Sequence, residues 1–212
     1  AKVTDSGRMQ MFWNGQKIVD LSRAFLDTSG CAKKQDAKIS HLQEVNSNSI
    51  EFNEDNFYKI LAEKNTASQK GLVEMFDSTV GATTVALPFG GKYQTTETEG
   101  CVQTLPILNA ENIETVSYAS WGFDAEISKQ NSMIGASLAV VESVAKIVAM
   151  GGNFRNVRLS FQEYFEKLGN NSEKWGKPLA SLLGAYDAQV NLGLAAIGGK
   201  DSMSGTYQDI NV

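Results

Sequence analysis

The sequence predicts an α+β fold in which helices cover one face of a mixed β-sheet. Two long segments carry apolar residues at helical spacing, and several shorter segments have the β-branched and aromatic residues of strands. Strands with two covering helices form a two-layer domain around one core. With 42% apolar and 20% charged residues, the 212-residue chain has the composition of a protein with such a core.

The first thirty residues predict a β-hairpin followed by a short helix. Alternating side chains at 9–13 lead to Asn14-Gly15, the strongest two-residue hairpin signal, and residues 17–19 return. We expect Asp20 to cap a helix that continues through Leu26. Because two strands and a short helix bury too little surface alone, this segment is predicted to be the tail of another unit.

The middle of the chain predicts a linker and then strands. Residues 31–68 are rich in polar side chains, with one short helix expected at 53–64. Beyond residue 69, four apolar runs predict strands at 73–76, 83–87, 102–107 and 115–121.

Two long helices follow. Ser132 is expected to cap the first, which ends at Gly151-Gly152, and Pro178 is expected in the first turn of the second, which ends near Gly193. A strand is predicted at 157–160 between them and another at 194–197 after them. Each helix has an apolar stripe of the kind that faces a core: Ile134, Leu138, Val141, Ala145 and Val148 in the first, and Leu179, Leu182, Leu183, Tyr186 and Val190 in the second.

Composition excludes several classes of function. A net charge of -5 argues against a nucleic-acid binder, which needs a surplus of Lys and Arg. The single His41 and the widely spaced Cys31 and Cys101 argue against a zinc site or a disulfide scaffold. No eighteen-residue apolar run or secretory signal is present. We expect a soluble, cytoplasmic protein, and both chain ends look cut from something larger.

The most specific local feature is Gly198-Gly199-Lys200-Asp201-Ser202, expected as a loop after the last strand. Glycines allow close approach to a ligand, Lys200 supplies positive charge for a phosphate, and Ser202 a hydroxyl donor. Asp201 could hold a metal ion or position the lysine. The segment is not a P-loop, and a plain glycine turn with solvated charges fits the pattern equally well.

Other candidates have a functional and a structural interpretation. Asp77 could contact magnesium or phosphate, or form an ordinary turn. Lys70 and Lys92 could reach an anion or be surface lysines. Glu142 and Lys146 stand four residues apart on a helix, which favours an ion pair, although Glu142 could face a metal.

Four segments together resemble one enzyme family. They are residues 197–205 (IGGKDSMSG), 70–82 (KGLVEMFDSTVGA), 141–152 (VESVAKIVAMGG) and, less specifically, 161–168 (FQEYFEKL). The chain resembles phosphoribosylformylglycinamidine synthase, the glutamine-dependent enzyme of purine biosynthesis, in the long single-chain form of clostridia and their relatives.

The resemblance implies an architecture and an activity. It implies two tandem modules similar to aminoimidazole ribonucleotide synthetase, followed by a glutaminase domain. Residues 1–30 would end the first module, 31–68 would connect, and 69–212 would form the N-terminal subdomain of the second. The parent enzyme would be a carbon–nitrogen ligase that uses ATP, Mg²⁺ and glutamine to convert formylglycinamide ribonucleotide, a phosphorylated substrate, into the amidine.

The resemblance also implies site residues. Lys70, Asp77 and residues 198–202 would lie near a nucleotide, ATP or ADP, and Glu142 would help to bind Mg²⁺. Two departures from the family pattern concern that metal. Lys146 stands where some relatives carry an Asn ligand, and Gly100 precedes Cys101 where some have Asp, with Glu99 as a substitute. An ammonium group at Lys146 would repel Mg²⁺ or take its place.

Three functions follow from these patterns. The chain could be a catalytic portion of the ligase, a structural or allosteric module whose second site binds a nucleotide or nothing, or part of another kinase-like member of the superfamily. For the isolated chain we expect the module, inactive by itself. Its partners would be the remaining domains of the parent enzyme in cis, and an apolar sheet face or edge would make it self-associate.

Overall fold

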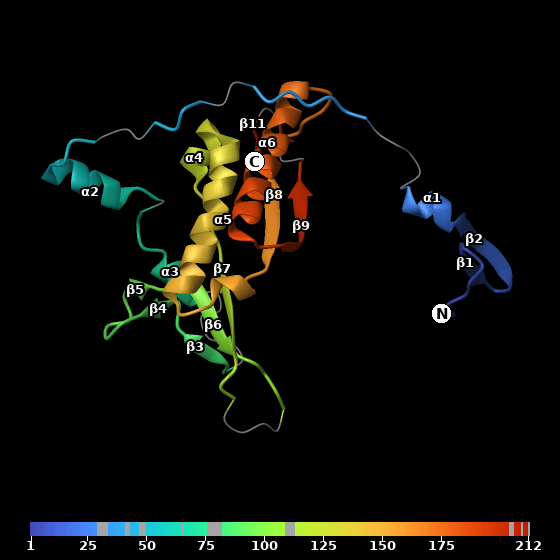
Figure 1. The fold of residues 1–212 in the computed structure, drawn as a ribbon, viewed down its shortest axis with the longest axis horizontal. Helices are drawn as coiled ribbons and strands as arrows, with labels where there is room; N and C mark the ends of the chain where they lie inside the picture. Colours follow the sequence, from blue (N-terminus) through green and yellow to red (C-terminus); the bar gives the residue numbers. More distant parts are fainter. Residues whose placement is uncertain are drawn as a thin grey trace. The chain divides into compact units, whose positions relative to one another are not determined.

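The computed structural model describes residues 1–28, 34–40, 43–46, 50–64, 66–75, 82–108, 113–203, 206–208 and 210–211 (Figure 1). The chain divides into two compact units, Ala1–Asp36 and Ala37–Val212. Each unit is a separate body with its own elements.

The smaller unit is the predicted hairpin and helix. Strands β1 (Arg8–Trp13) and β2 (Gln16–Ser22) pair antiparallel, and α1 (Arg23–Asp27) follows. Asn14 and Gly15 both have positive φ, at 46° and 80°, which is the turn geometry that matches the twist of two paired strands. The hairpin prediction is confirmed.

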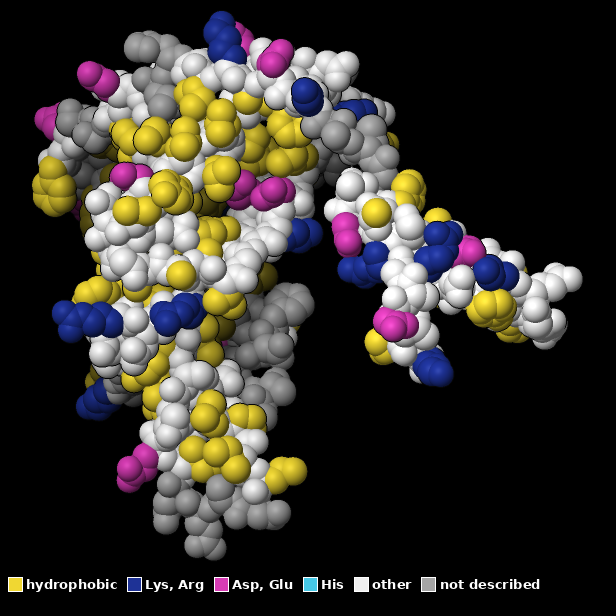
Figure 2. All heavy atoms as spheres, turned by 45° about the vertical axis from the view of Figure 1, so that its right-hand side comes forward, with side chains coloured by type: hydrophobic (Ala, Val, Ile, Leu, Met, Phe, Trp, Pro, Cys, Tyr) yellow, Lys and Arg dark blue, Asp and Glu magenta, His cyan; other side chains and the backbone are white. Residues whose placement is uncertain are grey.

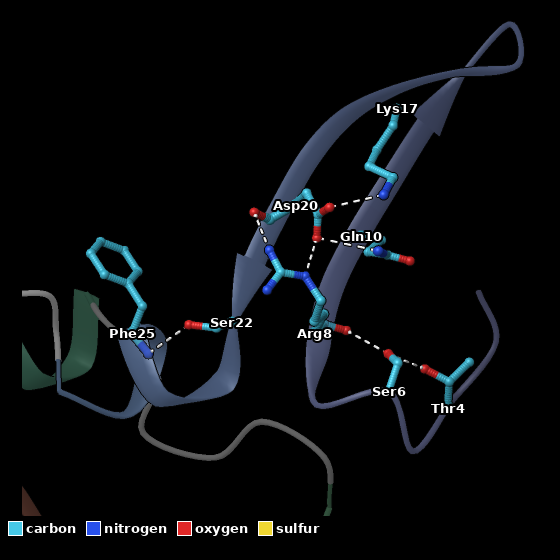
Figure 3. A network of polar contacts seen from close by, with 8 residues as sticks. All are labelled: Thr4, Ser6, Arg8, Gln10, Lys17, Asp20, Ser22 and Phe25. Carbon is cyan, nitrogen blue, oxygen red and sulfur yellow. Dashed lines mark hydrogen bonds and ion pairs between the residues drawn. The ribbon is translucent and has the colours of Figure 1, made fainter.

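Asp20 takes part in a network of hydrogen bonds and does not cap a helix (Figure 3). Its carboxylate lies in β2, where it accepts hydrogen bonds from Lys17, Arg8 and Gln10. The bonds from Lys17 and Arg8 hold the pKa of Asp20 well below its usual range. The expected capping role was wrong because β2 extends to Ser22, whose hydroxyl accepts from the Phe25 N–H at 3.2 Å.

The larger unit alternates helices and short strands. Its first half contains α2 (Glu54–Ala62), α3 (Lys70–Met75), β3 (Thr84–Ala86), β4 (Phe89–Gly90), β5 (Thr96–Glu97), β6 (Gly100–Thr104) and β7 (Val116–Ser120). Its second half contains α4 (Ala125–Gln130), α5 (Ser132–Ala149), the 3₁₀ turn η1 (Phe154–Asn156), β8 (Leu159–Tyr164), α6 (Ser172–Leu192), β9 (Ala196–Ser202), β10 (Thr206–Tyr207) and β11 (Ile210–Asn211).

The strands of this unit pair in both directions. β3, β6 and β7 form an antiparallel sheet with β6 in the centre, whereas β8 and β9 form a parallel pair. The α6 helix connects β8 to β9, as a crossover between parallel strands requires. The predicted α+β class is confirmed, and antiparallel and parallel strands stand in separate ladders.

The core lies where α5 and α6 pack against each other and against β8. Its buried residues are Val140 and Val144 of α5, Leu159 of β8, Ala185 and Ala188 of α6, and Leu194. A hydrogen bond also joins the two helices, in which the Ser181 hydroxyl donates to the Ser132 carbonyl at 3.4 Å. At Gly184 the backbones nearly touch, since an added Cβ would lie 1.9 Å from the Met133 carbonyl oxygen.

Both predicted apolar stripes face away from this core. Leu138 and Val141 of α5 are 43% and 46% exposed, and Leu182 and Tyr186 of α6 are 60% and 63% exposed. The buried face of α6 consists of small residues instead, including Ala180, Ser181 and Gly184. The expectation that the stripe residues face the core was wrong. Small residues of α6 meet other apolar residues of α5, Val140 and Val144, at the close contact instead. Figure 2 shows apolar side chains in groups on the visible surface.

Three boundary predictions need correction. Residues 70–75 form helix α3, not a strand, because the Gln69 carbonyl accepts helical hydrogen bonds from Leu72 and Val73. Asn131, rather than Ser132, caps α5. The α6 helix begins at Ser172 with Asn171 as its cap, which leaves Pro178 inside the helix instead of in its first turn.

Polar residues from the predicted linker dock on the larger unit. The Lys38 N–H donates to the Ser172 carbonyl at 2.8 Å, and the Asn131 amide donates to the Gln43 carbonyl at 3.1 Å. Gly176 of α6 lies so close to Lys38 that a Cβ would meet its carbonyl oxygen at 2.1 Å. These contacts anchor residues 38–40 and 43–46 to the starts of α5 and α6. Helix α2 lies within 53–64 as predicted, with Asn53 as its cap.

Among the described helices, α5 is long and apolar enough to cross a membrane by length and composition. It is weak support for a membrane span, because core helices pass the same test. The helix carries Glu142 near its centre and Lys146 in its last turn, both in one ion pair, and contributes four buried residues to the folded unit.

The close contact at Gly184 predicts a large effect of one added methyl group. Gly184→Ala should destabilise the chain by about 1–3 kcal/mol, because a Cβ there would force α5 and α6 apart. Gly71→Ala is the matched control, since Gly71 is also helical but has nothing within 4 Å, and it should be neutral or stabilising by up to about 1 kcal/mol. Urea unfolding of both variants measures the difference, and equal midpoints would contradict this packing.

Candidate functional site

The predicted phosphate loop is a strand. Residues 198–202 form most of β9, which runs parallel to β8 with Lys200 opposite Gln162 and Asp201 opposite Glu163. Neither Gly198 nor Gly199 has positive φ, so the expected glycine turn was wrong. Gly199 instead allows close pairing, because a Cβ there would meet the Phe161 carbonyl oxygen at 2.7 Å.

This strand divides the candidate side chains between two faces, because neighbouring residues of a strand point in opposite directions. Lys200 and Ser202 share one face, and the Lys200 ammonium donates to the Ser202 hydroxyl at 3.1 Å. Asp201 lies on the other face beside Glu163. One phosphate can therefore meet Lys200 and Ser202 together but not Asp201 as well.

Glu163 and Asp201 form a carboxyl pair across β8 and β9. Burial, followed by the negative charge and hydrogen bond of Asp201, raises the pKa of Glu163 to about 7. Because the pKa of Glu163 is raised to about 7, this carboxyl group is partly protonated near neutral pH. Sequence reasoning missed Glu163, although its place in an alternating strand pattern could have indicated a side chain on one defined face.

The Lys70 ammonium is held by residues of α3, of β4 and of the turn after β4. It donates to the Gln94 carbonyl at 2.8 Å, lies 3.6 Å from Glu74, and stands 5.9 Å from the centre of the Phe89 ring. Asp77 lies outside the described residues. Within the described part of the chain, no hydrogen bond or ion pair joins Lys70 to β9.

A cleft of about 1890 Å³ opens between β7, β8 and the helices α4 to α6. Small-molecule pockets are typically about 300–1,000 Å³, so this cleft is too large to define a nucleotide site by its shape. Glu163 lines it, as does Glu166, which is ion-paired with Lys174 and Lys177 at 2.8 and 2.6 Å. Hydrogen bonds from these two lysines lower the pKa of Glu166.

Both sequence-predicted metal ligands meet one lysine. The Lys146 ammonium lies 2.7 Å from Glu142 and 3.0 Å from Glu99, and its side chain is only 16% exposed. It also stands 5.4 Å from the centre of the Trp121 ring. Burial lowers the pKa of Lys146, but hydrogen bonds and charge from Glu142 and Glu99 outweigh burial, so the pKa is raised.

Backbone contact holds the segment after β7 beside this cluster. Gly122 lies against α5, where a Cβ would meet the Ala139 carbonyl oxygen at 2.1 Å. The flanking Phe123 N–H donates to the second carboxylate oxygen of Glu142 at 3.1 Å. The structure thus brings together Glu99, Glu142 and Lys146, as the spacing on the helix indicated in part. No sequence pattern indicated the Trp121 contact.

Comparison with known proteins gives one consistent result in sequence. The chain is 27% identical over 159 residues to the PurL subunit of phosphoribosylformylglycinamidine synthase from Campylobacter hominis. It is 25% identical over 154 residues to the same subunit from Campylobacter lari. Both matches cover 71% of this chain and 20% of the relative, so the chain spans about a fifth of the length of these curated relatives. No family model matches the chain.

Solved structures give the same result for the fold. PurLQS from Thermotoga maritima aligns with 98% of this chain and 30% of its own chain, at a TM-score of 0.66 and 16% identity. T. maritima PurL complexed with ATP aligns with 96% of this chain and 29% of its own, at a TM-score of 0.63 and 16% identity. The resemblance drawn from the motifs is confirmed, and the fold is that of a part of PurL. The long single-chain form stays a prediction.

The raised pKa of Glu163 predicts a pH-dependent stability. Between its unfolded value of 4.5 and its folded value of about 7, the folded chain holds a proton that the unfolded chain releases, so stability falls as pH rises through this window. Glu163→Gln cannot ionise and should flatten the fall. Thermal unfolding at about pH 5 and about pH 8 measures it.

The exposed Glu51→Gln serves as the control and should keep the wild-type slope. An unchanged slope in Glu163→Gln would show that the folded chain does not raise the pKa of Glu163.

Proposed function

We propose that this chain is part of a phosphoribosylformylglycinamidine synthase, the ligase that makes formylglycinamidine ribonucleotide from formylglycinamide ribonucleotide, ATP and glutamine. The observation that carries the proposal is the agreement of sequence and fold on the same enzyme. Both relatives matched in sequence carry this name, and the similar structures are PurL chains that align over nearly all of this chain.

Within that enzyme, residues 1–30 would end the first synthetase-like module, and residues 69–212 would form the N-terminal subdomain of the second module. Residues 31–68 would connect the two modules. The outward apolar stripes of α5 and α6 support such a place, because exposed apolar surfaces of this kind mark contacts with other protein. The partners are then the remaining domains of the same enzyme. The glutaminase that supplies ammonia belongs to these remaining domains, and the enzyme works in the cytoplasm.

For the chain itself we propose a nucleotide-binding support module, not a complete catalytic centre. T. maritima PurL has been solved with ATP, with ADP and with the substrate FGAR. Here Lys200 and Ser202 offer a phosphate one ammonium and one hydroxyl on the same face of β9. Asp201 faces Glu163 instead, so its role would be to hold β9 beside β8. Gly198, beside Lys200 on an open face, leaves room for a phosphate.

The proposed nucleotide-binding residues also include Lys70, Asp77 and Gly199, whose roles differ. Gly199 allows β9 to approach β8, whereas Lys70 and Asp77 would contact the nucleotide from the other segment that matches the family. Because each segment offers only part of a phosphate site, the chain binds a nucleotide weakly and performs no turnover alone.

Calorimetric titration with ADP tests this assignment. Lys200→Ala should weaken ADP binding by about tenfold or more, the effect of losing one charge-assisted hydrogen bond. Lys92→Ala is a matched control, because Lys92 also follows two glycines but stands over the Tyr93 ring at 5.2 Å, and it should leave ADP binding unchanged.

Two results would contradict the module. Equal loss of ADP binding in both variants would remove the specific role of Lys200. Formation of the amidine product by the chain alone, with ATP, substrate and ammonia, would show a complete catalytic centre.

A further inference from the structure

Two carboxylates of the larger unit converge on one internal ammonium group. Lys146 Nζ lies 2.7 Å from Glu142 Oε1 and 3.0 Å from Glu99 Oε2. These residues come from two places in the fold, since Glu142 and Lys146 lie on α5 and Glu99 directly precedes β6. The Lys146 side chain is the least exposed of the three, at 16% against 39% for Glu142 and 51% for Glu99.

An aromatic ring and a backbone N–H group also contact this cluster of Lys146 and its two carboxylates. The Trp121 ring stands 5.4 Å from Nζ, within the range of a cation–π contact. Glu142 uses its second oxygen to accept from the Phe123 N–H at 3.1 Å. Each carboxylate therefore has an oxygen bound to a fixed donor, and Glu142 has both.

The residues present do not fit the Mg²⁺ that the family resemblance places at Glu142. Magnesium requires about six oxygen ligands at about 2.0–2.1 Å. The described residues contain no group of three or more Asp, Glu, His or Cys side chains that could hold a metal. Lys146 is a third obstacle, because a divalent ion between Glu142 and Glu99 would lie against an ammonium of like charge.

We propose that Lys146 replaces a divalent cation in this position as a permanent, covalently attached counter-ion. The ammonium joins α5, the segment before β6 and the segment after β7 without metal, and the chain consequently recruits no divalent ion at Glu142. The identity of the replaced ion rests on the proposed function, whereas the place of Lys146 between the carboxylates rests on the geometry alone.

Binding of Mn²⁺, followed by its electron paramagnetic resonance signal, tests the proposal on the intact chain. The wild type and Glu142→Gln should bind Mn²⁺ to the same extent, because Glu142 holds no divalent ion in the wild type. Lys146→Asn frees both carboxylates and supplies an amide oxygen, so Mn²⁺ affinity should rise by about tenfold or more. Adding Glu142→Gln to Lys146→Asn should abolish that gain.

Thermal unfolding gives a second readout. Mn²⁺ or a chelator should leave the melting temperature of the wild type unchanged. Lys146→Met should lower it by about 4 °C or more, because two carboxylates then lack their counter-ion. Lys129→Met is the control, since Lys129 pairs with Glu126 at 2.8 Å on an exposed surface, and it should shift the melting temperature by less.

Stoichiometric Mn²⁺ binding by the wild type that Glu142→Gln removes would overturn the proposal. An equal, small shift in Lys146→Met and Lys129→Met would also overturn it, because the cluster would then be an ordinary surface ion pair. Both readouts are independent of ADP, so a chain that fails to bind nucleotide would contradict the proposed function without affecting this inference.

Discussion

The close packing of α5 against α6 is the contact on which the rest of the larger unit depends. The helices approach until Gly184 lies against the Met133 carbonyl, and β8 joins them through Leu159. This approach requires small residues on the buried face of α6 and therefore places the larger apolar side chains of α6 outside. It also fixes the start of each helix, where residues 38–40 and 43–46 dock, and it leaves Glu142 and Lys146 on the side of α5 that meets Glu99 and Phe123.

Local features of this fold could be predicted from the sequence. Asn14-Gly15 specifies its turn by itself because both residues tolerate positive φ. Both long helices, α2 and strands β6 and β7 follow from periodicity within each segment. The faces of the helices could not be predicted, because α5 and α6 are apolar on more than one side. Which side is buried depends on how closely another backbone can approach, and that is a property of the tertiary fold.

The candidate site likewise has some features that the sequence predicts and others that only the tertiary fold determines. The spacing of Glu142 and Lys146 on one helix indicated an ion pair, and the structure adds Glu99 and Trp121 from distant segments. Residues 198–202 were expected to form a loop because glycines and charges are typical of loops. Pairing with β8 extends them into a strand, and only that parallel register brings Asp201 to Glu163.

We infer that the outward apolar stripes of α5 and α6 are contact surfaces for other protein. Exposed residues such as Leu182, Tyr186 and Val190 give these helices an apolar outer face that water solvates poorly. The small residues on the buried face of α6 explain why its larger side chains lie outside. In a larger enzyme, neighbouring domains would cover these faces, and in the isolated chain a second copy can do so.

Sedimentation velocity over a range of concentrations tests this claim most directly. We predict that the average mass of the wild-type chain rises with concentration up to tens of micromolar, roughly where a weak dimer populates. The double variant Leu182→Gln, Tyr186→Ser, which changes only exposed side chains, should remain a monomer. A wild-type chain that sediments as a monomer throughout this range would contradict the claim.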